Sequence, residues 1–219
     1  MSANLMRGAV PPEAVASLIE NHQADVVALQ ELPEDNGWVE YRNVIGWDSF
    51  HRLGQGLGIA ARRTMDVWSA RARHRPLVVA DLDPDHWIDL QMPVRVINVH
   101  LTHPFVFPWW RSAASRQSQL TAIEAAVEQG PELCIVLGDF NTPSGWPTYR
   151  RLNRLMVDAA ADVTHPRRRP EPTWSLRSGG RRLLRIDHAW IMGLAAKDVA
   201  VAPLFGSDHC ALLVHVEVP

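Results

Sequence analysis

Cysteine is scarce in this sequence, and long apolar runs are absent from it. The two cysteines, Cys134 and Cys210, lack the spacing of zinc ligands, which excludes a zinc site built on cysteine. We expect both to be buried free thiols, with a disulfide between them as the alternative. No apolar run approaches the roughly 18 residues that span a bilayer, and no basic and then apolar leader precedes the first predicted helix. The sequence therefore predicts no transmembrane segment.

Localisation is not readable from any segment of the chain. A cytoplasmic protein is the default expectation, and an extracytoplasmic one follows if a leader has been removed. Asn4 stands where the end of a first strand is expected, which allows for a longer natural N-terminus. The 219 residues suffice for one sizeable core, and 47% apolar with 21% charged residues is an ordinary soluble composition. We expect one domain over residues 1–219, a monomer without an obligate protein partner.

Lysine is almost missing, because Lys197 is the only one. The net charge is −2, yet ten arginines and three acidic residues fall between Arg150 and Arg185, so this segment has a surplus of seven positive charges. A local surplus of this size suits an anionic partner such as a nucleic acid. The alternative is a solvated arginine-rich loop that binds nothing.

The most informative stretch is LCIVLGDFN, residues 133–141. Its apolar run ends in Gly138, which is typical of a buried strand that stops where a glycine lets the backbone turn. Asp139 and Asn141 then stand at the strand edge, two residues apart, and can face the same way. A carboxylate that orients water or a cation, next to an amide that donates to a phosphoryl oxygen, suits phosphate chemistry. A plain strand-ending turn is the alternative.

Elsewhere the apolar periodicity predicts alternating helices and strands. The loop at 102–111 contains too much proline for a helix or a central strand, and its aromatic residues form either a hydrophobic plug over the core or a base-stacking or lipid-facing lip. We predict helices over 10–23 and 115–129, a short helix after the turn at 142–146, strands over 25–31, 56–63, 94–101 and 183–192, a hairpin over 77–92 and an irregular segment over 36–52. The segment 207–215 places Asp208 and His209 immediately before a closing strand.

Polar residues gather at the predicted strand edges. Because strands interleaved with two long helices predict a layered α/β domain, a sheet can bring such edges into one cleft. Oxygen ligands without cysteine favour Mg²⁺, Mn²⁺ or Ca²⁺ over zinc. The strand-edge residues are Asn4, Glu31, His100, Asp139, Asn141, Asp208 and His209.

Six short motifs follow one another in an order that resembles the endonuclease/exonuclease/phosphatase superfamily, which has the deoxyribonuclease I-like fold. Each motif is weak alone, but six in this order, over nearly the whole chain, are specific. The resemblance implies an α/β (α+β) four-layer sandwich, with two packed mixed β-sheets and helices on the outer faces. The motifs are ANL at 3–5, LQE at 29–31, NVHL at 98–101, GDFN at 138–141, RIDH at 185–188 and SDH at 207–209.

The resemblance further implies a divalent-metal-dependent attack of water on a phosphodiester. Glu31 is then expected to be the principal ligand of Mg²⁺, or of Mn²⁺ or Ca²⁺, and Asn4 and Asp208 to complete or support the metal shell. Asp139 is expected to orient or deprotonate the water, and Asn141 to hold a phosphoryl oxygen. A bound divalent ion would neutralise charge on the phosphorus centre.

Two histidines receive roles from the same resemblance. His209, polarised by Asp187, is expected to act as a base or as a phosphate ligand, since an Asp–His pair fixes the tautomer and raises basicity. His100 is expected to bind phosphate or to protonate the leaving oxygen.

The favoured substrate is DNA, with RNA as an alternative, because the arginine-rich loop lies where the resembling family contacts the nucleic acid backbone. The candidate substrate-binding residues are Arg116, Trp174, Arg181 and Arg182. The second reading is a lipid or small-molecule phosphodiesterase of the sphingomyelinase type, with residues 105–110 as an interfacial lip. A non-catalytic binding module has little support, since every motif acid is present.

Overall fold

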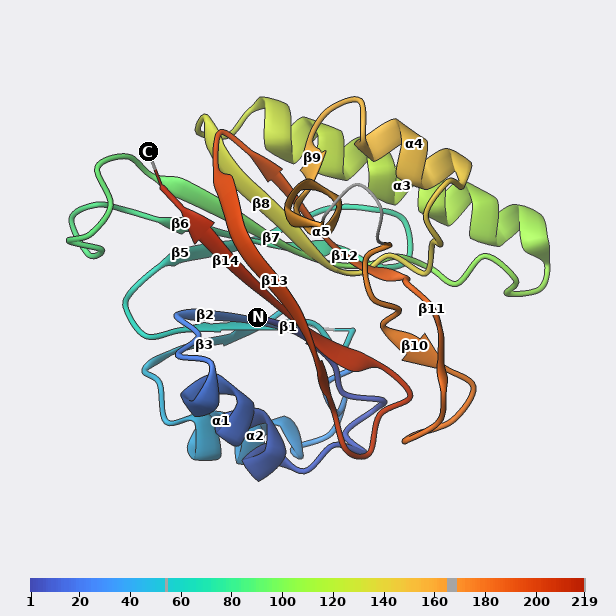
Figure 1. The fold of residues 1–219 in the computed structure, drawn as a ribbon, viewed down its shortest axis with the longest axis horizontal. Coiled ribbons are helices and arrows are strands. Elements are labelled where there is room, and N and C mark those ends of the chain that lie inside the picture. Colours follow the sequence, from blue (N-terminus) through green and yellow to red (C-terminus); the bar gives the residue numbers. More distant parts are fainter. Residues whose placement is uncertain (54, 165–168, 219) are drawn as a thin grey trace.

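The computed structural model of the protein describes residues 1–53, 55–164 and 169–218. Its strands form two mixed sheets of six strands each, packed face to face (Figure 1). Helices α1 (Pro12–Asn21) and α2 (Trp38–Ile45) lie outside one sheet, and α3 (Trp109–Glu128) and α4 (Pro147–Leu152) lie outside the other. The predicted four-layer α/β sandwich is confirmed. Among the described residues, no helix combines the length and apolarity that crossing a bilayer requires.

The first sheet pairs the beginning of the chain with its last strands. β1 and β2 run parallel, and the other described neighbours run antiparallel. Val15 and Ile19 of α1, four residues apart, bury one helix face against this sheet. In sheet order the strands are β13 (Ala195–Pro203), β14 (Cys210–Glu217), β1 (Ser2–Asn4), β2 (Val26–Gln30), β4 (Gly58–Ala61) and β3 (Ser49–Arg52).

The second sheet carries the GDFN stretch in its middle. β7 and β8 run parallel, so His100 and Asp139 end side by side in register. α3 covers the outer face through Leu120, Ile123 and Val127. In sheet order the strands are β5 (Asp66–Ala70), β6 (Leu77–Leu82), β7 (Val94–His100), β8 (Leu133–Asp139), β12 (Asp187–Met192) and β9 (Val157–Asp158). Helix α5 (Ala159–Val163) follows β9 in the chain. A separate two-stranded hairpin consists of β10 (Trp174–Ser175) and β11 (Arg182–Leu184).

A buried amide pair ties the two sheets together. Gln30 at the end of β2 donates from Nε2 to Asn98 Oδ1 of β7 at 2.7 Å, and both residues are fully buried. Asn98 Nδ2 donates in turn to the carbonyl oxygens of Leu29 and Gly58 at 2.9 and 2.7 Å. Breaking any of these hydrogen bonds would leave a polar atom unpaired in the core. The network therefore fixes how the two sheets stack. The ends of β2 and β7, which carry motif residues, are thereby held in a fixed position relative to each other.

Gly138 has a different task from the one that the sequence suggests. β8 continues through Gly138 to Asp139, and the sharp turn falls at Asn141, where φ is 47°. Gly138 has a φ of 144°, and a Cβ on it would lie 1.9 Å from the carbonyl oxygen of Val99. The glycine is therefore required for the close approach of β7 and β8 rather than for a turn.

Most predicted elements are present, but four predictions are wrong. The hairpin over 77–92 has only its first strand. After β6 the backbone N–H groups of His86 and Trp87 donate to the carbonyl oxygen of Asp83, which forms a turn, and the Trp87 ring is buried in the core. The segment over 36–52 is not irregular, since it contains α2 and β3. Tyr41 and Ile45, four residues apart, bury the inner face of α2, and tertiary packing outweighs the local composition.

The other two errors concern the ends of elements. Asp187 begins β12 rather than standing inside a strand over 183–192, because residues 182–184 pair with β10 in the separate hairpin. The proline-rich loop is shorter than predicted, since α3 already begins at Trp109 after Pro108. Its aromatic side chains do not plug the core, because Phe105 and Phe107 are 74% and 83% exposed. The free, buried cysteines agree with the expectation.

Candidate active site

Two acids meet at neighbouring strand ends of the two sheets. Glu31 follows the last residue of β2, and Asp139 is the last residue of β8. Asn4 joins them, because its Nδ2 donates to Glu31 Oε1 at 3.3 Å and to Asp139 Oδ2 at 3.1 Å. Glu31 and Asn141 both have a left-handed backbone, with φ of 54° and 47°. Non-glycine residues rarely adopt this conformation, and it concentrates at functional sites.

Asp139 lies at the centre of this hydrogen-bond network. Its Oδ1 accepts the backbone N–H of Asn141 at 2.8 Å, and its Oδ2 accepts Asn141 Nδ2 at 3.3 Å. His100 Nε2 lies 3.4 Å from Asp139 Oδ2 and 3.8 Å from Glu31 Oε1. Burial lowers the pKa of His100 to about 4, although Asp139 opposes the shift. The imidazole of His100 is therefore neutral at pH 7.

Asp187 and His209 form a buried pair on the other side of Asp139. His209 Nδ1 lies 2.9 Å from Asp187 Oδ2 and 3.1 Å from Oδ1. His209 Nε2 lies 3.8 Å from Asp139 Oδ2 and 4.0 Å from Asp208 Oδ1. Burial alone would lower the pKa of His209, but Asp187, Asp139 and Asp208 outweigh it and raise the pKa to about 10. His209 is thus a cation at neutral pH in this geometry.

Two exposed edges show where the cluster opens to solvent. The side chains of Glu31 and Asp208 are 27% and 25% exposed, whereas that of Asp139 is 2% exposed. Trp174 lies at this opening, because its Nε1 donates to Asp208 Oδ2 at 2.9 Å. The strand-edge residues named from the sequence, together with Asp187, thus form one contiguous network with a single charged face toward solvent.

Two positioning residues were not singled out from the sequence. Ser207 Oγ donates to the carbonyl oxygen of Asn4 at 2.8 Å and accepts the backbone N–H of His209 at 3.0 Å. Thr173 Oγ1 accepts the backbone N–H of Asp187 at 3.1 Å. Ser207 begins the SDH motif, which is the signal that could have identified it. Thr173 has no comparable signal, because its role depends on the β10–β11 hairpin folding back.

The cluster has an excess of negative charge. Within the described ranges, the ion-pair contacts of Glu31, Asp139, Asp187 and Asp208 are made by the imidazoles of His100 and His209, with no arginine or lysine among them. One ligand atom each of Asp139, Asp187 and His209 lies within 4.8 Å of the others, which forms a possible metal-binding group. A carboxylate-rich set of this kind fits a hard divalent cation.

Asn4 does not present a metal-ligand atom to this cluster. Its Oδ1 accepts the backbone N–H of Met6 at 3.0 Å, and this contact directs Nδ2 toward Glu31 and Asp139. An amide nitrogen carries no free lone pair for a cation. In this geometry Asn4 holds the two acids in place, which is the supporting part of the role that the sequence predicts for it.

The predicted substrate-binding arginines are not brought into the cluster. Arg116 is buried, and its guanidinium donates to the carbonyl oxygens of Thr102 and Phe140 and to the hydroxyl of Thr142, so it supports the GDFN turn and is not open to a substrate. Arg182 pairs with Glu171 at 3.0 Å, and Arg181 is exposed. The part of the arginine-rich loop at 165–168 lies outside the described residues.

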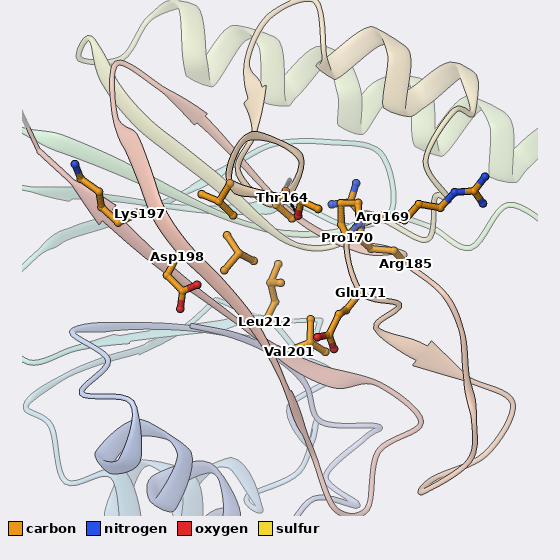
Figure 2. Close-up of a pocket in the computed structure, with 12 residues that line it drawn as sticks. Thr164, Arg169, Pro170, Glu171, Arg185, Lys197, Asp198, Val201 and Leu212 are labelled. Carbon is orange, nitrogen blue, oxygen red and sulfur yellow. Dashed lines mark hydrogen bonds between the residues drawn. The ribbon is translucent and has the colours of Figure 1, made fainter. Parts of the chain in front are cut away.

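A separate groove of about 740 Å³ lies between α5, β13 and the segment that begins at Arg169 (Figure 2). Its polar lining residues include Thr164, Glu171, Lys197 and Asp198, and it shares no lining residue with the carboxylate cluster. Because the lining contains no histidine, and its two acids share it with Arg169, Arg185 and Lys197, this groove lacks the chemistry of the cluster.

The layered fold and the acid–imidazole cluster at its strand ends define a hydrolytic phosphoesterase. The model of the Endonuclease/Exonuclease/phosphatase family matches residues 1–209, and the chain belongs to this family. The predicted superfamily membership is thus confirmed. No curated protein matches the sequence.

Solved structures share the fold at low sequence identity. A functionally unknown conserved protein from Enterococcus faecalis V583 is 21% identical, with a TM-score of 0.75 over 95% of this chain and 91% of that chain. A humanized D. rerio TDP2 with 14 mutations is 17% identical, with a TM-score of 0.73 over 99% and 97%. The mannosyl-6-phosphatase Bt3783 from Bacteroides thetaiotaomicron VPI-5482 is 15% identical, with a TM-score of 0.73 over 99% and 98%. At these identities the likeness concerns the fold alone.

Proposed function

We propose that this protein is a divalent-metal-dependent phosphodiester hydrolase. The observation that carries the proposal is the convergence of four carboxylates whose described charged partners are imidazoles alone. Glu31 and Asp208, the two exposed acids, would hold Mg²⁺, Mn²⁺ or Ca²⁺ at the opening. Such an ion would neutralise charge on the phosphoryl oxygens and lower the pKa of bound water. We also propose that residues 1–219 act as one catalytic domain and as a monomer.

The buried acid orients the attacking water in this proposal. Asp139 is fixed by donors from Asn4 and Asn141, so a water whose hydrogen bond it accepts would be held in a defined position. A carboxylate that is held by neutral donors accepts a proton from water without moving. Asn141 Nδ2, which donates to Leu101 O at 3.0 Å, can exchange this contact for a phosphoryl oxygen.

The two histidines take different roles because their charges differ. In the metal-free geometry the surrounding carboxylates raise the pKa of His209, so we propose that it donates its Nε2–H to a phosphoryl or leaving oxygen, while Asp187 fixes its orientation. His100 is neutral, so it can bind a phosphoryl oxygen but cannot supply a proton at pH 7. We therefore assign the acid to His209 and phosphate binding to His100.

DNA is the first candidate substrate, with RNA as its alternative. The exposed Arg177 and Arg181 lie on the hairpin that carries Trp174, where a phosphate backbone could follow the opening. The support is weaker than the arginine count indicates, since Arg151, Arg182 and Arg185 each pair with an acid of the chain itself.

A lipid or small-molecule phosphodiester is the second candidate. It is favoured by the exposed aromatic side chains over 105–110, which follow His100 by a few residues. The mannosyl-6-phosphatase with the same fold illustrates that this architecture is not restricted to one class of phosphoester.

Hydrolysis of bis-para-nitrophenyl phosphate tests the chemistry without assuming a natural substrate. We expect turnover with Mg²⁺ or Mn²⁺, loss of turnover with a chelator, and a decrease of at least about 100-fold in Glu31→Gln. Glu34→Gln, a change of the same charge at an exposed acid nearby, is the control. Full turnover in the chelator, or in Glu31→Gln, would contradict the proposal. Plasmid DNA, RNA and phospholipid vesicles in parallel then separate the substrates.

A further inference from the structure

Large apolar side chains project into solvent from the loop that follows His100 and from the start of α3. Phe105, Phe107, Trp109 and Trp110, here called the aromatic lip, are 55–83% exposed. Their rings contact each other or Trp146 edge to face, with centroids 5.9–6.2 Å apart, which keeps them clustered but not covered. Clustered exposed apolar surface of this kind usually marks an interaction site.

Two further segments, which are hydrogen-bonded to the catalytic residues or their neighbours, also expose a large apolar side chain each. Leu176, 76% exposed, follows Ser175, whose backbone N–H donates to Asp208 O at 2.9 Å. Phe205, 79% exposed, precedes Ser207, whose hydroxyl donates to Asn4 O. In Figure 1 the start of α3 lies at the right of the view, the β13–β14 turn lies at the bottom, and the β10–β11 hairpin lies between them. The lip together with Leu176 and Phe205 is here called the apolar rim.

The segments that carry the rim have a surplus of positive charge, although Arg182 is paired with Glu171 and the acids Glu31 and Asp208 lie at the active site itself. Residues 5–9, 103–111, 176–184 and 203–206 contain five arginines and no acidic residue. Arg7, Arg111 and Arg177 are exposed beside the apolar side chains. Arginine next to exposed aromatic and aliphatic side chains is the composition of protein surfaces that enter the interface of an anionic bilayer.

The opposite end of the second sheet provides a contrast. The connection from β6 to β7 lies at the start of β7, whereas His100 ends that strand. It also exposes apolar side chains, with Ile88 at 77% and Met92 at 37%. Residues 83–92 contain three acidic residues and no arginine or lysine, so an anionic surface would repel this end.

We propose that the apolar rim docks the protein on an anionic phospholipid surface, so that the phosphodiester of a lipid headgroup is presented to the active site. The substrate part rests on the second candidate of the proposed function, the lipid phosphodiester, whereas the docking part does not. For the rim itself a bilayer fits better than a nucleic acid, because Leu176 and the aliphatic Leu183 and Leu184 of the same hairpin offer no ring for base stacking.

Vesicle sedimentation tests the docking. We expect the full chain to bind vesicles of phosphatidylcholine and phosphatidylglycerol in equal amounts, and to bind pure phosphatidylcholine more weakly. The double variant Phe107→Ser/Trp109→Ser should lose about tenfold or more of this binding. Ile88→Ser/Met92→Ser, which removes apolar side chains at the opposite end, should bind as the wild type does. A second rim variant, Leu176→Ser/Phe205→Ser, gives the same test if the first fails to fold.

Activity measurements separate the docking from the chemistry. The rim variants should lose hydrolysis of phospholipid in the mixed vesicles by about tenfold more than hydrolysis of bis-para-nitrophenyl phosphate. Wild-type protein that fails to bind the mixed vesicles overturns the inference, even if it hydrolyses the soluble ester. Equal loss of vesicle binding in the Ile88/Met92 variant also overturns it. If single-stranded DNA binding, and not vesicle binding, depends on the rim, the rim is a base-stacking surface. Vesicle binding without any metal-dependent hydrolysis refutes the proposed function and leaves the docking intact.

Discussion

His188 and His209 are both buried next to carboxylates, and yet their pKa values move in opposite directions. Burial and the nearby Arg185 lower the pKa of His188 to about 4, against the pull of Asp158. At His209 the three carboxylates around it outweigh burial and raise the pKa to about 10. Asp187, the partner of His209, directly precedes His188 on β12. The side chains of Asp187 and His188 therefore point to opposite faces of the second sheet.

The difference lies in how each cluster balances its charge. On the outer face, the Arg185 guanidinium donates to both oxygens of Asp158, and Tyr149 donates its hydroxyl to the same carboxylate at 2.6 Å. On the inner face, acids outnumber the described cations that pair with them. A cluster whose charge is balanced within the chain supports the fold, whereas one with unbalanced charge is a candidate ligand site. On the proposed function, this contrast separates the structural Asp–His contact from the catalytic one.

Removing His209 should have the largest effect. We expect His209→Ala to reduce kcat for bis-para-nitrophenyl phosphate by about 10²–10⁴-fold, because the proton donor to the leaving oxygen is lost. The change also leaves the buried carboxylate of Asp187 without its imidazole partner, so the thermal melt must show that the variant is folded before its kcat is compared. His215→Ala, at an exposed position of β14, is the matched control. Steady-state kinetics with thermal melts decide the matter, and an unchanged kcat in a folded His209→Ala protein rules the assignment out.

Removing Arg185 should damage stability rather than chemistry. The side chains of Arg185 and Asp158 are 7% and 0% exposed, and Arg185→Met leaves an uncompensated buried charge. Breaking such a pair costs about 3–5 kcal/mol of unfolding free energy. Arg182→Met breaks the exposed pair with Glu171 and should cost about 0–1 kcal/mol. Urea denaturation measures both, and equal midpoints would contradict the distinction between the two clusters.

Acid should destabilise the outer cluster through His188. The unfolded pKa is about 6.5 and the folded pKa is about 4, so the unfolded state binds more protons between these values. Stability is therefore full above about pH 6.5 and is lost as the pH falls toward 4, by up to about 3 kcal/mol at 1.36 kcal/mol per pKa unit.

His188→Gln keeps a donor for Thr142 O and should flatten this part of the pH profile. His209 has the opposite sign in the metal-free protein, since its raised pKa stabilises at low pH and the contribution fades as the pH rises through about 10. Unfolding free energies from pH 4 to pH 7 in chelator test the His188 term. A variant with the same slope as the wild type would show that His188 is not the titrating group.

The sequence predicts much of the fold because its signals are local. The helical spacing of Val15 and Ile19 and the apolar run before Asp139 each identify an element without tertiary information. The hairpin at 77–92 fails for the opposite reason, since the strands next to β6 are β5 and β7, and no local pattern states that pairing. The sequence does not predict α2, because only two of its residues, Tyr41 and Ile45, are buried, and they are buried by the sheet that they face and not by a local pattern.

The site is predictable as a set of residues but not as a set of roles. The motifs name Glu31, Asp139 and His209, which the two sheets bring together. They do not reveal that Asn4 turns its nitrogen toward the acids, which depends on the backbone N–H of Met6. Nor do they reveal that Arg116 is buried beneath the GDFN turn, because charge in a sequence carries no information on the partner that neutralises it.

The smallest expected effect concerns the stability of the unbalanced cluster itself. Glu31→Gln removes one of four clustered negative charges and should raise the unfolding free energy by about 0.5–1 kcal/mol in chelator, as activity-related strain often does when relieved. With added Mg²⁺ the wild type should be the more stable of the two proteins, because only the wild type gains unfolding free energy from binding the ion. Glu34→Gln should shift stability by less than about 0.5 kcal/mol in either condition. If Mg²⁺ stabilises Glu31→Gln as much as the wild type, Glu31 does not hold the ion, and the charge excess on the inner face has another ligand.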